Sequence, residues 1–423
     1  MKKLLSVLLA STMALSVAGG LAACGDGDDR NTIKIWAPAA SISGYKALIN
    51  GFKEENPDYK KYTFKFENKE ENDVQGALSD PKAGAHVFFF PSDHLNNLAY
   101  KLKCLQPLPE TYVAAVTARD SKETVDLVTK NYDGTKDQIY AFPATDDNGY
   151  FLWYDSSKIG ATDIATWDSL IAAAKAKNSK VMFNYGDSYY APSFFFGAGV
   201  TFDYTDDTLE EYDTNVDSAE GIAAAGAYIK YFSSSYIGTG DKAVIVDKNP
   251  TSALAEAFAN GSIVAGVGGT WVAPSVKKAM GDRYSNIKTA KLPSFTNGNN
   301  TYNMGSFIGG KYCGVNAAKP AEQIEVALAF ANYLTGEVGQ QARYDSTGAG
   351  PTNKVVAATD AVVNDPILAT YRAQKESCGY PQKDQPSTFW EGINAFVKEI
   401  VGGKTTATNV GTKLEKLAKS MRG

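Results

Sequence analysis

Histidine and cysteine are scarce in this chain, with two histidines and four cysteines among 423 residues. His86 and His94 are too few for a zinc site built from several histidines, and no pair of cysteines has CxxC spacing. We therefore expect no metal ion and no cofactor. Three cysteines follow the N-terminal leader and allow either one disulfide at most or three buried free thiols: Cys104, Cys313 and Cys378.

Several catalytic and nucleotide-binding motifs are absent as well. The chain has no GxSxG elbow, no P-loop, no HExxH, and no GxGxxG that opens a helix after a strand. The net charge of −5 gives no reason to expect a nucleic-acid partner. Glycoside hydrolysis stays open, because it needs only two suitably separated carboxylates and this chain has many acids.

The N-terminus reads as a secretory leader. Lys2 and Lys3 precede an apolar run that ends in Leu21-Ala22-Ala23-Cys24, and a basic start, an apolar stretch and small residues before a cleavage point define a signal peptide. The cysteine directly after the small residues resembles a bacterial lipobox. We expect a signal peptide over 1–23, a lipidated Cys24 (palmitate) and a flexible acidic tether over 24–31. The alternative is an uncleaved anchor helix, which the glycines at both ends of the cleavage region disfavour.

Strand and helix patterns alternate after the tether. Thr32 to Trp36 alternates like a strand, a helix pattern follows, and Val87 to Phe90 is a short apolar run typical of a strand buried on both faces. The same order begins again after Pro143, with a strand at Tyr150 to Tyr154. Such β-α-β order predicts two α/β lobes, each with a mainly parallel sheet flanked by helices.

Aromatic and polar residues gather next to four of the expected strands. In open α/β sheets, ligands bind beyond the carboxyl ends of the strands, and planar rings cover the apolar faces of sugars while carboxylates and amides bind hydroxyls. Each cluster alone is commonly an ordinary turn with half-buried tyrosines, but four in this topology favour a ligand cleft. The clusters are Phe90 to His94, Asp146 to Tyr150, Asp187 to Tyr190, and Gly269 to Trp271.

Short markers in a fixed order give the chain a family resemblance. Each is weak alone, whereas their order and spacing are fairly specific: Ile33-Lys34-Ile35-Trp36, Phe142-Pro143, Thr166-Trp167-Asp168-Ser169, Phe258-Ala259-Asn260-Gly261, Thr270-Trp271, Gly305-Ser306-Phe307, Gly314-Val315-Asn316, Gly350-Pro351-Thr352-Asn353 and Phe389-Trp390. On these markers the whole mature sequence resembles extracellular solute-binding proteins of the maltose-binding type, the receptors of ABC sugar importers. The glycine-rich markers most resemble Gram-positive maltodextrin receptors.

The resemblance implies a sugar site between two lobes. Phe90 stands where the family has a stacking tryptophan, His94 where it has an arginine, and Glu391 where it has a tyrosine. The aromatic platform is kept while the polar set is rewritten, which preserves oligosaccharide binding better than it preserves maltose. The implied substrate-binding residues are Trp36, Phe90, Asp93, His94, Asp147, Asn148, Asp187, Tyr189, Tyr190, Trp271, Trp390 and Glu391.

The combined interpretation is an α/β protein with the two-lobe, type II periplasmic-binding-protein-like fold and hinge crossovers. We expect one lobe from 32–145 plus 302–349 and the other from 146–301 plus 350–423, with crossings near Thr145, within 297–303 and near 349–351. The expected function is an extracellular, lipid-anchored and monomeric receptor that delivers maltodextrin-like oligosaccharides to an ABC permease, without catalysis. The alternatives are a receptor of the same fold for another oligosaccharide or a polyol, and a secreted glycoside hydrolase.

Overall fold

Residues 30–207, 209–238, 242–248 and 250–423 are described by a computed structural model. The expected signal peptide and Cys24 lie outside these residues, as does most of the expected tether. Within the described ranges, no helix is long and apolar enough to cross a membrane.

The first lobe is built on a five-stranded sheet in the order β2-β1-β3-β17-β6. Its core joins Ile33, Phe88 and Phe89 to Phe330 and Leu334 of a helix much later in the chain. The strands are β1 (Thr32–Ala37), β2 (Thr63–Asn68), β3 (Val87–Pro91), β6 (Phe142–Pro143) and β17 (Lys311–Val315). Its helices include α1 (Ala39–Ala47), α2 (Ile49–Glu55), α3 (Val74–Ala77), α4 (Glu110–Arg119), α5 (Lys122–Leu127), α12 (Ala321–Leu334) and α13 (Glu337–Thr347).

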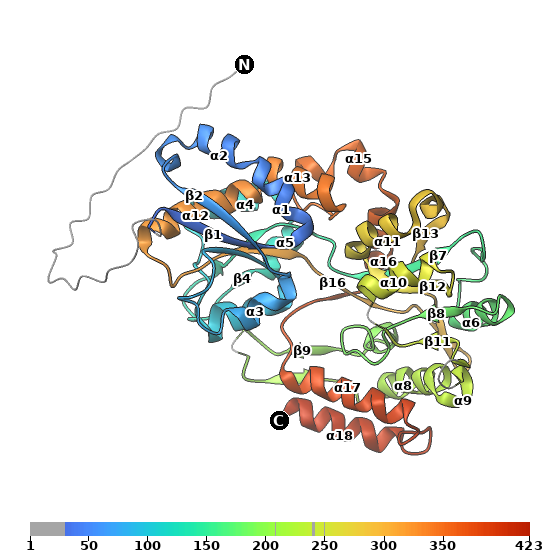
Figure 1. The fold of residues 1–423 in the computed structure, drawn as a ribbon. Coiled ribbons are helices and arrows are strands. Elements are labelled where there is room, and N and C mark those ends of the chain that lie inside the picture. Colours follow the sequence, from blue (N-terminus) through green and yellow to red (C-terminus); the bar gives the residue numbers. More distant parts are fainter. Residues whose placement is uncertain (1–29, 208, 239–241, 249) are drawn as a thin grey trace.

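The second lobe has its own five-stranded sheet in the order β11-β8-β12-β7-β13. Its strands are β7 (Tyr150–Asp155), β8 (Lys180–Met182), β11 (Ile245–Val246), β12 (Ile263–Gly269) and β13 (Ile287–Ala290). Helices that pack in this lobe are α6 (Trp167–Ala176), α7 (Ser193–Ala198), α8 (Ala219–Phe232), α9 (Ser234–Ile237), α10 (Pro250–Ala259), α11 (Ala273–Met280), α17 (Ser387–Val401) and α18 (Val410–Arg422). The two lobes lie side by side in Figure 1, with β16 (Ser306–Ile308) between them.

Each sheet contains one strand that runs against its neighbours. β17 is antiparallel to both β3 and β6, and β7 is antiparallel to both β12 and β13; the other pairings in both sheets are parallel. The expected two-lobe α/β architecture is confirmed, but the sheets are mixed. Apolar periodicity identifies a strand without giving its direction, so the sequence could not show the reversals.

The connections between the lobes lie close together. The run Gly305 to Gly314 is divided by Gly309-Gly310 into β16 and β17. A Cβ atom on Gly310 would overlap the carbonyl oxygen of Thr145. Glycine at this position therefore lets the first two connections pack against each other.

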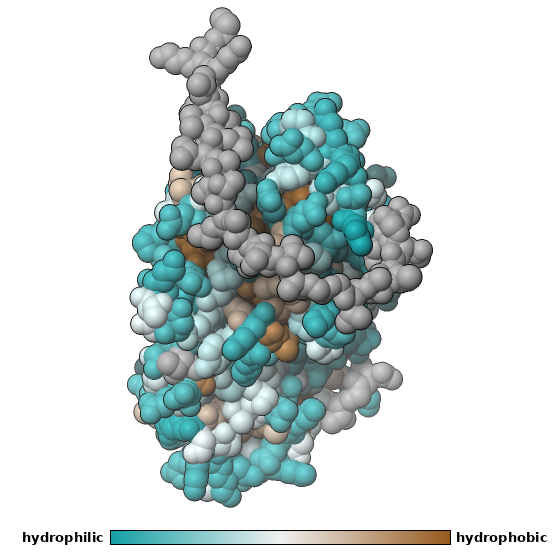
Figure 2. Space-filling model, turned by 90° about the vertical axis from the view of Figure 1, so that its left-hand side faces the viewer, coloured by the Kyte–Doolittle hydropathy of each residue, from teal (hydrophilic) through white to brown (hydrophobic). Residues whose placement is uncertain are grey.

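Figure 2 shows a largely hydrophilic face, with its main apolar area near the middle of the view.

The second connection comes later than the sequence suggested. Residues 295–302 form the hairpin of β14 (Phe295–Asn297) and β15 (Asn300–Tyr302). Phe295 and Phe307 both belong to the core of the second lobe, whereas Tyr312 belongs to the core of the first. The chain therefore reaches the first lobe after Phe307.

Three further helices complete the region around the third connection. They are α14 (Lys354–Ala357), α15 (Asp360–Val363) and α16 (Pro366–Cys378). After α16 the chain forms β18 (Gly379–Pro381), which pairs with β16 in parallel. Among the described cysteines, Cys104, Cys313 and Cys378 are all free thiols, the first two buried and the third half-buried.

Candidate functional site

A cavity of about 310 Å³ lies between the lobes. The first lobe contributes Gln75 of α3 and residues that follow β3. The second lobe contributes Tyr204, Leu209 and residues in or just before α17. Predicted site residues Asp93, His94 and Trp390 all line it. The complete lining is Gln75, Asp93, His94, Asn96, Asn97, Lys101, Tyr204, Leu209, Asp384, Gln385, Pro386, Ser387 and Trp390.

Asp93 and His94 occupy the short helix η3 (Ser92–His94) that follows β3 directly. Asp93 Oδ1 and His94 Nδ1 are buried and have no hydrogen-bond partner among the described residues. Burial lowers the pKa of the His94 imidazole, so the ring favours its neutral form, in which one nitrogen accepts and the other donates. Buried polar atoms are almost always paired in folded proteins, so these two neighbouring cavity atoms are candidates for contact with a ligand.

Tyr189 has a third unpaired polar atom. Its hydroxyl oxygen is buried and has no partner in the described part of the chain. Burial raises the pKa of this phenol well above its usual value, and the nearby charge of Asp93 raises it further. Tyr189 therefore remains a neutral hydroxyl that can donate one hydrogen bond and accept another.

A series of aromatic rings runs through Tyr189. Its ring stacks on Phe307 with centroids 5.4 Å apart and lies 6.4 Å from Trp271. Phe307 in turn lies 6.3 Å from Trp390, and Tyr190 meets Tyr189 edge to face at 5.0 Å. The structure thus brings the predicted rings Tyr189, Tyr190, Trp271 and Trp390 together, joined by Phe307, which the sequence analysis did not select.

Local structure positions Tyr189 through Asp187. The two oxygens of the Asp187 carboxylate accept hydrogen bonds from the Tyr189 backbone N–H (2.8 Å) and the Asn184 amide (3.1 Å). This is the turn-forming use of aspartate. Asp187 was predicted to contact a ligand, and in the structure its carboxylate shapes the turn that presents the ring.

Asp147 and Asn148 were also predicted to bind ligand, but both are buried and already paired within the protein. One oxygen of Asp147 accepts hydrogen bonds from the Thr270 hydroxyl and the Gly350 N–H, each at 2.8 Å. The Asn148 amide donates to the Gln382 side chain at 2.6 Å. These bonds hold the first segment that joins the lobes against distant parts of the chain. Both residues therefore stabilise the region of the connections.

Three further predicted residues lie away from the cavity. Phe90, expected to stack on a sugar, is 0% exposed and packs against Phe88 and Tyr312 in the first-lobe core. Trp36 is half-buried, and its indole N–H donates to Glu67. Glu391 is exposed on α17 and does not line the cavity.

Asp384 is a cavity residue that the sequence analysis missed. Both of its oxygens accept from the Asn96 N–H, at 3.0 and 3.1 Å, so it connects the second lobe to the first. Burial raises the pKa of this carboxyl well above its usual range, and the charge of Asp93 adds to the shift. The polar run before the helix that carries Trp390 is the signal that could have found it.

The lobes make two further polar contacts near the cavity. The Ser92 hydroxyl donates to the Gln382 carbonyl at 2.8 Å. Lys130 pairs with Asp207 at 2.6 Å; Lys130 lies in β4 (Thr129–Lys130), and Asp207 follows β9 (Phe202–Tyr204). In the described residues, no cluster of histidine, cysteine and acidic side chains is arranged to hold a metal ion.

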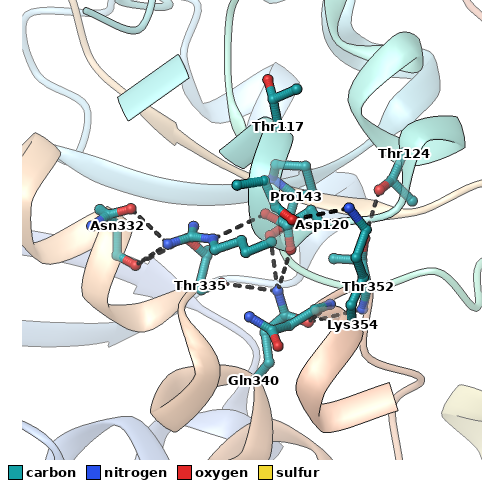
Figure 3. A network of polar contacts seen from close by, with 12 residues as sticks. Thr117, Asp120, Thr124, Pro143, Asn332, Thr335, Gln340, Thr352 and Lys354 are labelled. Atoms are coloured by element: carbon teal, nitrogen blue, oxygen red, sulfur yellow. Dashed lines mark hydrogen bonds and ion pairs between the residues drawn. The ribbon is translucent and has the colours of Figure 1, made fainter. Parts of the chain in front are cut away.

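A polar network anchors the third connection (Figure 3). Gln340 on α13 lies between Asp120 and Thr352. Its carbonyl oxygen accepts the N–H groups of Thr352 and Asn353, each at 2.8 Å. The hydroxyls of Thr124 and Thr352 are 2.6 Å apart, so the third connection is fixed to the first lobe.

Comparison with known proteins agrees with this architecture. A family model described as bacterial extracellular solute-binding protein matches residues 47–370. A structure determined with acarbose is 27% identical over 92% of this chain and 98% of that chain, with a TM-score of 0.79. None of the curated proteins matches the chain.

Two structures of lower identity share the fold. The maltodextrin-binding protein MalE1 from L. casei BL23, without ligand, is 21% identical over 93% of this chain and 99% of that chain, with a TM-score of 0.75. The maltose-binding protein MalE from Listeria monocytogenes, in complex with maltose, is 18% identical over 92% and 97%, with a TM-score of 0.70. The matched family and these named neighbours are binding proteins.

Proposed function

The chain belongs to the bacterial extracellular solute-binding proteins, and from this premise we propose that it is a receptor for maltodextrin-like oligosaccharides. One observation carries the proposal. Three buried, unpaired polar atoms, on Asp93 and His94 of the first lobe and on Tyr189 of the second, accompany a series of aromatic rings of the second lobe. Sugars present this combination of hydroxyl groups and apolar ring faces.

We keep all the predicted ligand residues but assign them different roles. Asp93, His94, Tyr189, Tyr190, Trp271 and Trp390 form the contact group, and Asp384 is added to it. Trp36, Asp187 and Glu391 stay in the proposed set but lie outside the contact group. Phe90 supports the site from the first-lobe core, and Asp147 and Asn148 support it from the hinge region.

The proposed mechanism is closure of two lobes around the sugar. We propose lobes of 32–145 plus 308–349 and 146–307 plus 350–423; the boundary expected at residue 302 moves to 308 because Phe307 packs in the second-lobe core. Binding favours the closed arrangement by as much as the ligand binds it more tightly than the open one. The receptor then presents its sugar to an ABC permease and acts as a monomer.

The proposed location is the outer face of the cell membrane, through lipid on Cys24. The support is the leader and the Leu21-Ala22-Ala23-Cys24 sequence. Fractionation of cells that express a Cys24→Ser variant tests this anchor, because the variant should leave the membrane fraction. Retention of the variant in that fraction would contradict the lipid anchor.

A ligand screen tests the function. A ligand that binds only the native state stabilises it by RT ln(1 + [L]/Kd), about 2.7 kcal/mol at one hundred times Kd. We expect maltose, maltotriose or maltotetraose to raise the melting temperature, and cellotriose and sorbitol not to. A response to cellotriose or sorbitol alone would assign another ligand to the same fold, and no response to any carbohydrate would reject the proposal.

Prolonged incubation separates the receptor from the glycoside hydrolase alternative. The receptor returns maltotetraose intact, whereas a hydrolase releases shorter products that chromatography detects. Product formation that Asp93→Asn abolishes would overturn the receptor assignment.

A further inference from the structure

Gln340 has an unusual number of buried connections for one neutral side chain. It is 2% exposed, and its carbonyl oxygen accepts the two N–H groups of the third connection at 2.8 Å each. Its amide nitrogen donates to the carbonyl oxygens of Thr335 (2.8 Å) and Pro143 (3.4 Å) and to Asp120 (3.1 Å). Pro143 lies at the end of β6, directly before the first connection.

Asp120 fixes which way the Gln340 amide points. Asp120 is 0% exposed, and its carboxylate accepts from the Arg119 guanidinium at 3.0 Å as well as from Gln340. An ionised carboxylate only accepts hydrogen bonds, so the amide turns its nitrogen to Asp120 and its oxygen to Thr352 and Asn353. The Arg119 guanidinium is held in turn by Asn332 at 2.7 Å and Thr335 at 3.0 Å.

The backbone supports the same junction independently. Asp120 and Asn353 form an antiparallel bridge, and the Ser121 N–H donates to the Thr352 carbonyl at 3.1 Å. Figure 3 shows Gln340 below Asp120, with its amide directed toward Asp120 and the third connection. The groups in this network come from the ends of α4 and α12, from α13 and from the third connection. One side chain thus holds the first and third connections in a fixed relation.

We propose that Gln340 is a positioning residue, which sets the relative orientation of the lobes and through it the affinity for ligand. This inference rests on the proposed function, because the affinity in question is that for oligosaccharide. Gln340 touches none of the cavity residues, so its effect on binding passes through the connections. Coupling between separate sites typically changes affinity by 5- to 150-fold.

Gln374 provides a matched control. It is 1% exposed, its oxygen accepts the Leu292 N–H at 2.8 Å, and its nitrogen donates to the carbonyl oxygens of Met304 (3.0 Å) and Cys378 (3.3 Å). Leu292 and Met304 belong to the second-lobe core. Both glutamines are therefore buried and bonded to backbone, but only Gln340 joins the connections.

The test compares Gln340→Met with Gln374→Met in full-length protein. Both variants lose buried hydrogen bonds, so both melt at lower temperature. We expect Gln340→Met to weaken maltotriose binding at least about fivefold by calorimetry, and Gln374→Met to leave the Kd within about twofold of wild type. Equal Kd values for Gln340→Met and wild type would overturn the proposal and leave Gln340 a purely structural role.

A ligand-free measurement separates this inference from the proposed function. Hydrogen exchange of the unliganded Gln340→Met protein should speed up in 144–149 as well as in 350–353, because the two connections lose their common anchor. In Gln374→Met both segments should exchange as in wild type. If the wild-type protein binds no oligosaccharide, the proposed function fails. The role of Gln340 is rejected separately, if exchange in 144–149 of Gln340→Met equals that of the wild type.

The pH dependence of binding provides a second readout. Burial raises the pKa of Asp120 to about 6, and the titratable groups that interact with it are Arg119, Lys354 and Tyr312. Both oxygens of the ionised Asp120 carboxylate accept hydrogen bonds, from Arg119 and Gln340. Protonation removes the charge and turns one oxygen into an O–H donor, which weakens these bonds. We expect wild-type affinity to fall more between pH 7 and pH 5 than that of Asp120→Asn. His94 and Asp384 are present in both proteins, so identical profiles would show that Asp120 does not act through the hinge.

Discussion

First-lobe residues that line the cavity are all polar, whereas the second lobe brings the aromatic rings. Gln75, Asp93, His94, Asn96, Asn97 and Lys101 come from the first lobe. Tyr204 and Trp390 come from the second lobe, and Tyr189 and Trp271 continue its rings. Apolar faces bind a sugar without fixed hydrogen-bond geometry, so the second lobe is suited to hold the ligand before closure. In the proposed closure, the polar groups of the first lobe would then complete the hydrogen bonds of the ligand.

The largest effect should come from removing a ring of the second lobe. Trp390→Ala should weaken maltotriose binding by ~1.5 kcal/mol or more, roughly tenfold in Kd, because a full stacking face is lost. Trp271→Ala should act in the same direction. Calorimetry measures both, with Tyr236→Ala as a control at a half-buried second-lobe ring that contacts Asp168 instead of the cavity. Unchanged affinity in both tryptophan variants would show that the rings are not the ligand platform.

A smaller effect should follow from changing the polar first lobe. Asp93→Asn keeps the shape of the side chain but replaces a charged acceptor by a neutral one, which should weaken binding by about 1 kcal/mol. Asp58→Asn changes an exposed acid of the same lobe and should leave the Kd unaltered. A loss for Asp93→Asn larger than that for Trp390→Ala would reverse the division of roles between the lobes.

The smallest effect should come from the ion pair between the lobes. Lys130→Met removes the ion pair with Asp207. The side chain of Lys130 is 19% exposed and that of Asp207 is 39% exposed. Partly exposed pairs contribute about 1 kcal/mol at most, and the loss in stability should shrink in 1 M salt. Chemical unfolding at low and high salt measures it, with Lys122→Met, which breaks a pair inside the first lobe, as the control. A loss of several kcal/mol would mean that charge, rather than the packing of the connections, holds the lobes together.

The sequence predicted elements better than contacts. Alternation identified β1, an apolar run identified β7, and the clusters that contain Asp93 and Trp271 do follow strands, β3 and β12. Phe90, predicted to stack on a sugar, is fully buried in the structure. A run of phenylalanines looks the same in the sequence whether its last member faces a cleft or the core.

The contacts of the hinge residues could not be predicted from the sequence for a different reason. Asp147 bonds to Thr270 and Gly350, which are 123 and 203 positions away. Gln340 likewise reaches Asp120 across 220 positions. An unpaired carboxylate and a paired one have the same letter in a sequence, so only the fold distinguishes a ligand contact from a hinge contact.

The reversed strand of the first lobe has a consequence for how the chain is made. β17 lies between β3 and β6 in the sheet, although it follows them by more than 160 positions. A nascent chain that ends before residue 311 therefore has a gap in the middle of its first sheet, with two unsatisfied edges. During biosynthesis and export the N-terminal third of the chain therefore has an incomplete sheet. The first sheet is completed only after most of the second lobe has been synthesised.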